Sequence, residues 1–240
     1  MNAGRLGIVT GLPAEVRAAR GAAARILCAD ASPARARSHA EALAASGAAA
    51  LVSFGVAGGL DPGLRPGTVV IATGIAAPGG SVLGVDGEWA GRLAARLEPA
   101  LGAVRAPVAG APETVADADA RAALARSTGA AAVDMESHEV ALAAVEARLP
   151  VLAVRAIADP AGRGLPASAL AALGVGRARV FNQLCRRPGD WATLARLAMD
   201  YRRALAALRR VVASGGSDLA FGGGASPGTS ADRARARARR

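Results

Sequence analysis

The stretch Val133-Asp-Met-Glu-Ser-His138, followed by Leu149-Pro-Val-Leu-Ala-Val-Arg-Ala-Ile-Ala-Asp-Pro160, decides the fold. A short apolar run ends at Glu136, where an alanine-rich segment begins that is predicted to be helical to about Arg148. Pro150 then breaks the helix, because proline lacks the backbone N–H that a helix needs. Val151–Ile157 is β-branched and nearly uncharged, which predicts a buried strand. A strand–helix–strand unit is therefore expected here.

Two acidic residues occupy the ends of these predicted elements. Glu136 lies at a strand-to-helix junction, and Asp159 lies just past the carboxyl end of a strand. Ligands of open α/β sheets bind at such ends, so the two carboxyl groups could face one crevice. A purely structural alternative is equally open, in which Glu136 sits in the first turn of a helix for its dipole and Asp159 caps a turn.

Length and composition favour one large domain. A chain of 240 residues with 52% hydrophobic residues can bury a substantial core, whereas two full domains would be cramped. Residues 1–212 are predicted to form this domain. Residues 213–240 are rich in Gly, Ser and Pro and end in alternating Arg and Ala, which predicts a flexible basic tail.

The formal net charge of +10 does not by itself indicate a nucleic-acid partner. All 29 basic residues are arginine, and the accompanying excess of alanine is typical of a coding bias spread over the surface. Aromatic residues make up only 2% of the chain, so the stacking platforms of a single-strand binder are missing. No nucleic-acid binding is expected.

Metal sites and disulfide frameworks are not expected either. The only cysteines are Cys28 and Cys185, and the only histidines are His39, placed on the solvated surface, and His138, given no role. The N-terminus lacks the pattern of a secretory signal, and no run reaches the ~18 apolar residues of a membrane span. A soluble, cytoplasmic protein is therefore expected.

Alternating strands and helices are predicted along the rest of the chain. The expected strands are 6–10, 25–28, 49–54, 68–73 and 103–109, and the expected helices are 14–20, 33–46, 88–97, 117–127 and 190–212. Such alternation is typical of α/β proteins. The predicted fold is a three-layer α/β sandwich with a central, mostly parallel twisted sheet.

Four motifs in this order resemble the nucleoside phosphorylase and nucleosidase superfamily. They are Glu15-Val16 after the first strand, Gly55-Val-Ala-Gly-Gly-Leu60, Val133-Asp-Met-Glu-Ser137 and Val154-Arg-Ala-Ile-Ala-Asp159. The resemblance covers about residues 5–210, and the nearest soluble relatives are the methylthioadenosine/S-adenosylhomocysteine nucleosidases. It implies cleavage of an N-glycosidic bond, no cofactor, and a homodimer.

The resemblance also implies a role for each matching residue. Asp159 would be the general acid toward the purine, Glu15 would activate water, Glu136 would hold the ribose hydroxyls, and Met135 would pack against the sugar. The ribose-binding loop would contain Val56, Ala57 and Gly58, and the base-contacting segment Thr114 and Val115. Two departures stand out: Val56 replaces a serine, and Thr114 or Val115 replaces a stacking phenylalanine.

The proposed acid must keep its proton near neutral pH, although an aspartate normally has a pKa of ~4. Asp159 follows an apolar strand, and burial among apolar groups raises the pKa of a carboxyl group. Hydrolysis is favoured over phosphorolysis, because no arginine occurs between Ala48 and Leu64 to bind phosphate and Glu15 would repel it. Arg17 is the nearest candidate; in that alternative phosphate would be a co-substrate.

The later part of the chain resembles one branch of the superfamily, the hopanoid-associated phosphorylases. The matching residues are Glu136-Ser-His138, the stretch from Ala158 to Leu170, and Arg187-Pro-Gly-Asp-Trp191. The branch is implicated in removing adenine from adenosylhopane, a lipid-linked nucleoside, and the basic tail could then contact anionic lipid. Alternatives are a purine nucleoside phosphorylase, a methylthioadenosine nucleosidase, or a non-catalytic nucleoside- or lipid-binding module.

Overall fold

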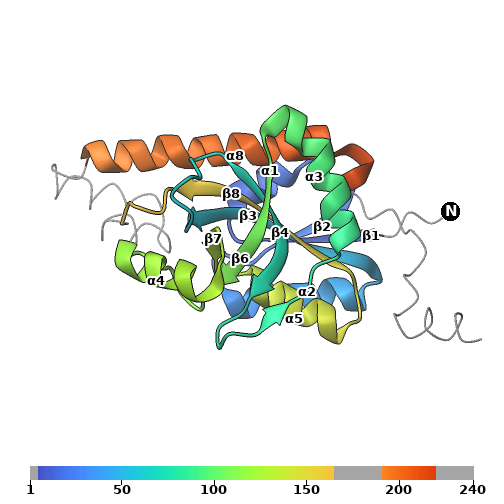
Figure 1. The fold of residues 1–240 in the computed structure, drawn as a ribbon. Helices are drawn as coiled ribbons and strands as arrows, with labels where there is room; N and C mark the ends of the chain where they lie inside the picture. Colours follow the sequence, from blue (N-terminus) through green and yellow to red (C-terminus); the bar gives the residue numbers. More distant parts are fainter. Residues whose placement is uncertain (1–4, 165–190, 220–240) are drawn as a thin grey trace, which may run out of the picture.

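The computed structural model describes residues 5–164 and 191–219 and contains a central sheet flanked by helices (Figure 1). The strands are β1 (Arg5–Thr10), β2 (Ala24–Cys28), β3 (Ala48–Gly59), β4 (Val69–Ala76), β5 (Val82–Leu83), β6 (Val104–Gly110), β7 (Ala132–Asp134) and β8 (Val151–Asp159). The helices are α1 (Pro13–Ala19), α2 (Pro33–Ala45), α3 (Gly87–Leu101), α4 (Ala118–Thr128), α5 (Ser137–Glu146) and α8 (Trp191–Leu219).

The sheet has eight strands, in the order β2-β1-β3-β7-β6-β4-β5, with β8 paired to both β3 and β4. Five of its pairings are parallel and three are antiparallel. Strands β3, β7, β6, β4 and β8 thereby close into a ring of pairings. The predicted α/β class with a mostly parallel sheet is confirmed, and the ring is a detail that strand patterns alone did not indicate.

Helices cover both faces of the sheet. On one face α1, α3 and α8 pack together on the apolar side chains of β1, β3 and β8, around the fully buried Trp89. On the other face α2 and α5 lie side by side and bury Leu43 and Val140 against the sheet (Figure 1). A smaller cluster joins α4 to the ends of β6 and β7. The expected three layers are present.

Helix boundaries follow recognisable capping signals. Asp86 and Asp117 accept hydrogen bonds from the backbone N–H groups that begin α3 and α4, which removes unsatisfied donors. Gly102 and Gly129 end the same helices in the left-handed conformation that glycine adopts most readily.

Strand β3 and helix α8 extend furthest beyond their predicted ends. Strand β3 continues through the glycine-rich segment to Gly59, because its last residues pair with β7 and β8. Helix α8 runs to Leu219, beyond the predicted domain end at Val212, with a kink at Gly216, whose backbone is not helical. Leu219 is buried, and the carbonyl of Asp218 accepts a hydrogen bond from Trp89 Nε1.

No helix in the described part of the chain is both long and apolar enough to span a membrane. Several predictions concern residues outside the described ranges. They are residues 165–170 of the stretch from Ala158 to Leu170, Arg187-Pro-Gly-Asp190 before α8, and residues 220–240 of the basic tail.

Candidate active site

A cavity of about 560 Å³ lies where β1, β3, β7 and β8 end, and α8 forms one of its walls. The structure brings all nine sequence-predicted site residues to this one cavity: Glu15, Val56, Ala57, Gly58, Thr114, Val115, Met135, Glu136 and Asp159. In the β3–β8 ladder Gly58 is the partner of Asp159, and in the β3–β7 pairing it is the partner of Val133. This register places Asp159 and the residues after β7 beside the same end of β3.

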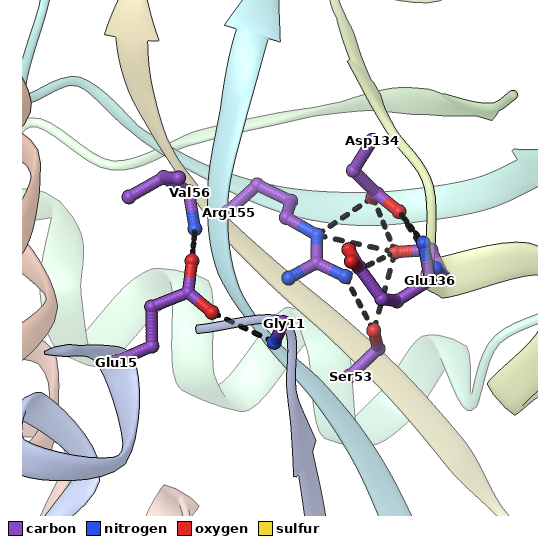
Figure 2. A network of polar contacts seen from close by, with 8 residues as sticks. Gly11, Glu15, Ser53, Val56, Asp134, Glu136 and Arg155 are labelled. Carbon is purple, nitrogen blue, oxygen red and sulfur yellow. Dashed lines mark hydrogen bonds and ion pairs between the residues drawn. The ribbon is translucent and has the colours of Figure 1, made fainter. Parts of the chain in front are cut away.

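Glu15 is fixed by the backbone of two separate elements (Figure 2). Its Oε2 accepts hydrogen bonds from the N–H groups of Gly11 (2.7 Å) and Leu12 (2.8 Å), and its Oε1 accepts one from Val56 (2.8 Å). Burial raises the pKa of Glu15, while these N–H donors and the Arg155 guanidinium oppose the rise. The carboxylate is therefore held in one orientation at the cavity.

Arg155 lies at the centre of a buried polar network next to this carboxylate (Figure 2). Its Nε donates to Asp134 Oδ2 at 2.6 Å, and its Nη2 donates to the hydroxyl groups of Ser137 (2.9 Å) and Ser53. Asp134 Oδ1 in turn accepts the N–H groups of Glu136 and Ser137 at the start of α5. Arg155 thus fixes the β7–α5 junction and forms a buried ion pair with Asp134.

Glu136 is 7% exposed and reaches the cavity from this junction. Burial, Asp134 and Glu15 raise its pKa from 4.5 to about 7, against the opposing effect of Arg155. Three carboxyl groups, those of Glu15, Asp134 and Glu136, thus surround one guanidinium group. A proton or a positively charged ligand is favoured at this end of the cavity.

Asp159 occupies the other side of the cavity and has a partner that the sequence did not reveal. Its Oδ2 forms an ion pair with Nη1 of Arg121 on α4, whose side chain is 2% exposed. The apolar strand before Asp159 predicted its burial but not this cation. Burial still raises the pKa of Asp159, and Arg121 offsets part of that rise.

Two glycines of the glycine-rich segment lie against ionisable side chains of the site. At Gly55, a Cβ atom would lie 2.7 Å from both Glu15 Oε1 and Arg155 Nη1. At Gly58, it would lie 3.2 Å from Arg121 Nη2. These two glycines make room for the ionisable side chains of the protein itself.

The remaining walls of the cavity are mostly apolar. Thr114 Oγ1 lies 3.4 Å from Met135 Sδ, so the predicted base-contacting segment meets the predicted sugar-packing residue. From the opposite side α8 contributes Leu194, Leu197, Ala198 and Tyr201. The sequence predicted this helix but gave it no place in the site.

Sequence reasoning missed Arg121, Asp134 and Tyr201 as cavity residues. Asp134 had a signal, since it belongs to the Asp-Met-Glu motif, whereas Arg121 is one of many arginines in an alanine-rich helix. His39, predicted to lie on the solvated surface, is only partly exposed, and His138, which was given no role, is buried. No cluster of three or more His, Cys, Asp or Glu side chains within the described residues could hold a metal ion.

The fold matches solved nucleosidase structures. It superimposes on the methylthioadenosine/S-adenosylhomocysteine nucleosidase of Neisseria meningitidis with a TM-score of 0.67 at 16% identity, over 88% of this chain and 97% of that one. The S-adenosylhomocysteine nucleosidase of Streptococcus pyogenes gives 0.65 at 16% identity, with the same coverage. The futalosine hydrolase of Helicobacter pylori gives 0.63 at 14% identity, over 88% and 98%.

No curated protein sequence matches the chain. The family model described as the phosphorylase superfamily matches residues 24–175, which is more than half of the chain and includes strand β3, the β7–α5 junction and Asp159. The protein therefore belongs to the phosphorylase superfamily, with the fold of enzymes that cleave the N-glycosidic bonds of nucleosides.

Proposed function

We propose that the protein hydrolyses the N-glycosidic bond of an adenine nucleoside whose 5′ position carries an apolar group, with adenosylhopane as the candidate substrate. One observation carries the proposal. The cavity has a carboxylate-rich end at Glu15 and Glu136, a buried carboxyl group at Asp159, and apolar walls between them. These are the groups that a ribosyl–purine bond needs for cleavage by water.

At the sugar end, an ionised Glu136 would accept hydrogen bonds from the ribose 2′- and 3′-hydroxyl groups. Met135 would pack against the sugar. Positive charge develops on the ribosyl group as the bond to the base breaks, and the surrounding carboxylates stabilise that charge. Glu15, fixed by three backbone N–H groups, would then take a proton from the water that attacks the anomeric carbon.

At the base end, a protonated Asp159 would give its proton to N7 of the purine. The electron pair of the bond between the anomeric carbon and N9 moves into the purine ring, and adenine leaves as a neutral molecule. Burial favours the protonated form of Asp159, as this step requires. The proton that Glu15 gains from water returns to Asp159 through solvent, so the cycle closes with one water consumed.

The apolar wall supports a nonpolar 5′ substituent. Leu194, Leu197 and Ala198 line the cavity on α8, which follows the part of the sequence that resembles the hopanoid-associated branch. A cavity of about 560 Å³ holds a nucleoside with part of a larger group. The structures from Neisseria meningitidis and Streptococcus pyogenes contain methylthio-immucillin-A and 5-methylthiotubericidin, and methylthioadenosine is therefore the second substrate to test.

The charges favour water over phosphate as the acceptor. Arg155 is engaged by Asp134, Ser137 and Ser53, and Arg121 is paired with Asp159. Arg17 is exposed and does not line the cavity. A phosphate dianion beside Glu15 would therefore meet carboxylates, and the arginine among the described residues that line the cavity, Arg121, is already paired with Asp159.

The test is adenine release from adenosylhopane and from methylthioadenosine, each with and without phosphate. Hydrolysis predicts release that is independent of phosphate and a free sugar as the second product. The Asp159→Asn variant should lose turnover of adenine nucleosides while it still binds them. Release that requires phosphate, with a sugar 1-phosphate as product, would establish phosphorolysis. Binding without turnover of either substrate, unchanged in Asp159→Asn, would establish a non-catalytic binding module.

The proposal extends to the oligomeric state, the cellular location and the membrane contact of the protein. We propose a homodimer in the cytoplasm whose basic tail contacts anionic lipid when the substrate is lipid-linked. Sedimentation equilibrium of the purified chain tests the dimer, since a monomer mass would exclude it. Fractionation of the source cells tests the location.

A further inference from the structure

Arg121 is a buried cation that the proposed reaction does not yet use. Its Nε donates a hydrogen bond to the carbonyl of Val115 at 2.7 Å, and its Nη1 lies 3.5 Å from the carbonyl of Pro160 and contacts Asp159. Its Nη2 lies beside Gly58, and no described residue accepts a hydrogen bond from it. The guanidinium group is therefore fixed between the predicted base segment and the predicted acid, on the lining of the cavity.

The charges of the cavity are divided along its length. Glu15, Asp134 and Glu136 gather around Arg155 at the proposed sugar end, whereas Asp159 at the proposed base end is paired with Arg121. Cleavage of an N-glycosidic bond separates charge in the same direction, because the sugar becomes positive and the purine takes the electron pair. A cation at the base end therefore stabilises what the reaction forms there.

We propose that Arg121 activates the leaving purine through Asp159, by stabilising the carboxylate that Asp159 becomes when it gives up its proton. The inference rests on the proposed function. Arg121 itself transfers no proton: the proton moves from Asp159 to N7, and the electron pair of the broken bond stays on the purine. Arg121 thus turns a buried carboxyl group, which burial keeps protonated, into an effective donor.

The experiment compares two leaving groups. Adenine needs protonation to leave, whereas the nitrophenolate of 4-nitrophenyl riboside leaves as a stable anion without it. Arg121→Met should lower kcat/KM for methylthioadenosine by about 100-fold, the size typical of removing one electrostatic contact to the transition state. For the nitrophenyl riboside the loss should stay below about threefold, because no proton is required. Arg121→Lys, which keeps the charge, should recover part of the loss.

The pH profile gives a second readout on methylthioadenosine alone. The charged groups that act on Asp159 are Arg121 on α4, Arg163 after β8, and Asp200 on α8. Removing Arg121 removes an effect that lowers the pKa of Asp159, so the alkaline limb of kcat/KM should move to higher pH. A loss of activity caused only by misfolding would leave that limb in place.

Arg126→Met is the matched control, because Arg126 is exposed on the same helix and the substitution removes the same positive charge. Equal losses for both substrates with an unmoved alkaline limb, or no loss for either, would overturn the role of Arg121. A wild-type protein that cleaves neither substrate would overturn the proposed function itself, so the two failures are distinguishable. If Arg121→Met is poorly folded, Arg121→Gln replaces it, because glutamine retains a donor for the Val115 carbonyl. This variant must show the same large loss of kcat/KM for methylthioadenosine and small loss for the nitrophenyl riboside.

Discussion

Gly55 lies against the charged side chains of Glu15 and Arg155. A Cβ atom at this position would lie 2.7 Å from both Glu15 Oε1 and Arg155 Nη1, closer than packed side chains approach. Gly55→Ala should therefore destabilise the fold by about 1–3 kcal/mol, the cost typical of overpacking, and reduce activity more than tenfold by displacing Glu15. Urea unfolding together with adenine release measures both effects.

The control for this substitution is Gly91→Ala. Gly91 lies inside α3 with open space where its Cβ would be, so alanine should stabilise the helix by about 0.5–1 kcal/mol. If Gly55→Ala is as stable and as active as the wild type, the close approach at Gly55 is not a constraint on the site.

Glu136 should make stability depend on pH. Its pKa rises from 4.5 in the unfolded chain to about 7 in the folded one, so between these values the folded state binds a proton that the unfolded state has lost. The free energy of unfolding should accordingly fall as pH rises from about 4.5 to 7, by roughly 3 kcal/mol in all at ~1.4 kcal/mol per unit. Denaturant titrations at a series of pH values measure this slope.

Because Glu15 and Asp159 also have raised pKa values, the informative quantity is the difference between the wild type and Glu136→Gln. The slope should flatten in Glu136→Gln and stay unchanged in Glu88→Gln, a substitution at an exposed site. Identical slopes in all three proteins would contradict the raised pKa of Glu136.

At the scale of elements, α8 joins the core to the cavity. One part of it packs on α1 and α3 through buried residues such as Leu208, while Leu194, Leu197 and Ala198 line the cavity. Asp200 ties this helix to the chain after β8, since it accepts hydrogen bonds from Arg163 and Arg203 at 2.8 Å each. The helix is therefore a built-in wall of the site.

Leu197→Glu tests that wall. A carboxylate on the apolar side should raise KM for adenosylhopane and methylthioadenosine at least tenfold, because the loss of one buried aliphatic contact is worth ~1.5–3 kcal/mol. Adenosine, which lacks an apolar 5′ group, should be affected less than threefold. Met199→Glu is the matched control, since Met199 is 49% exposed and does not line the cavity. An equal rise in KM for all three substrates would show that the 5′ group does not contact this wall of the cavity.

At the scale of the whole molecule, the net charge of +10 is unevenly distributed along the chain. Residues 220–240 contain five arginines and one aspartate, whereas the cavity is dominated by carboxyl groups. Truncation after Leu219 leaves α8 complete. It should weaken binding to anionic vesicles at low salt several-fold, at about 1 kcal/mol for each arginine near the surface, and leave methylthioadenosine cleavage unchanged. Vesicle co-sedimentation measures the binding, with neutral vesicles as the control; unchanged binding would remove the lipid role.

The sequence by itself determined the α/β class and the site residues that lie at element ends. Hydrophobic runs and helix breakers are local signals, so they predicted β1, β8 and the β7–α5 junction within a few residues. Resemblance to known motifs then selected Glu15, Glu136 and Asp159, and the structure brings the three to one cavity.

Only the tertiary structure decided what surrounds those three residues. The Arg121–Asp159 pair joins α4 to β8, and the Arg155–Asp134 pair joins β8 to β7, across 38 and 21 positions of sequence respectively. The close approaches at Gly55 and Gly58 likewise depend on strand register. Such contacts set the pKa values of the site's carboxyl groups. They form between segments that are distant in the sequence, so no local sequence pattern predicts them.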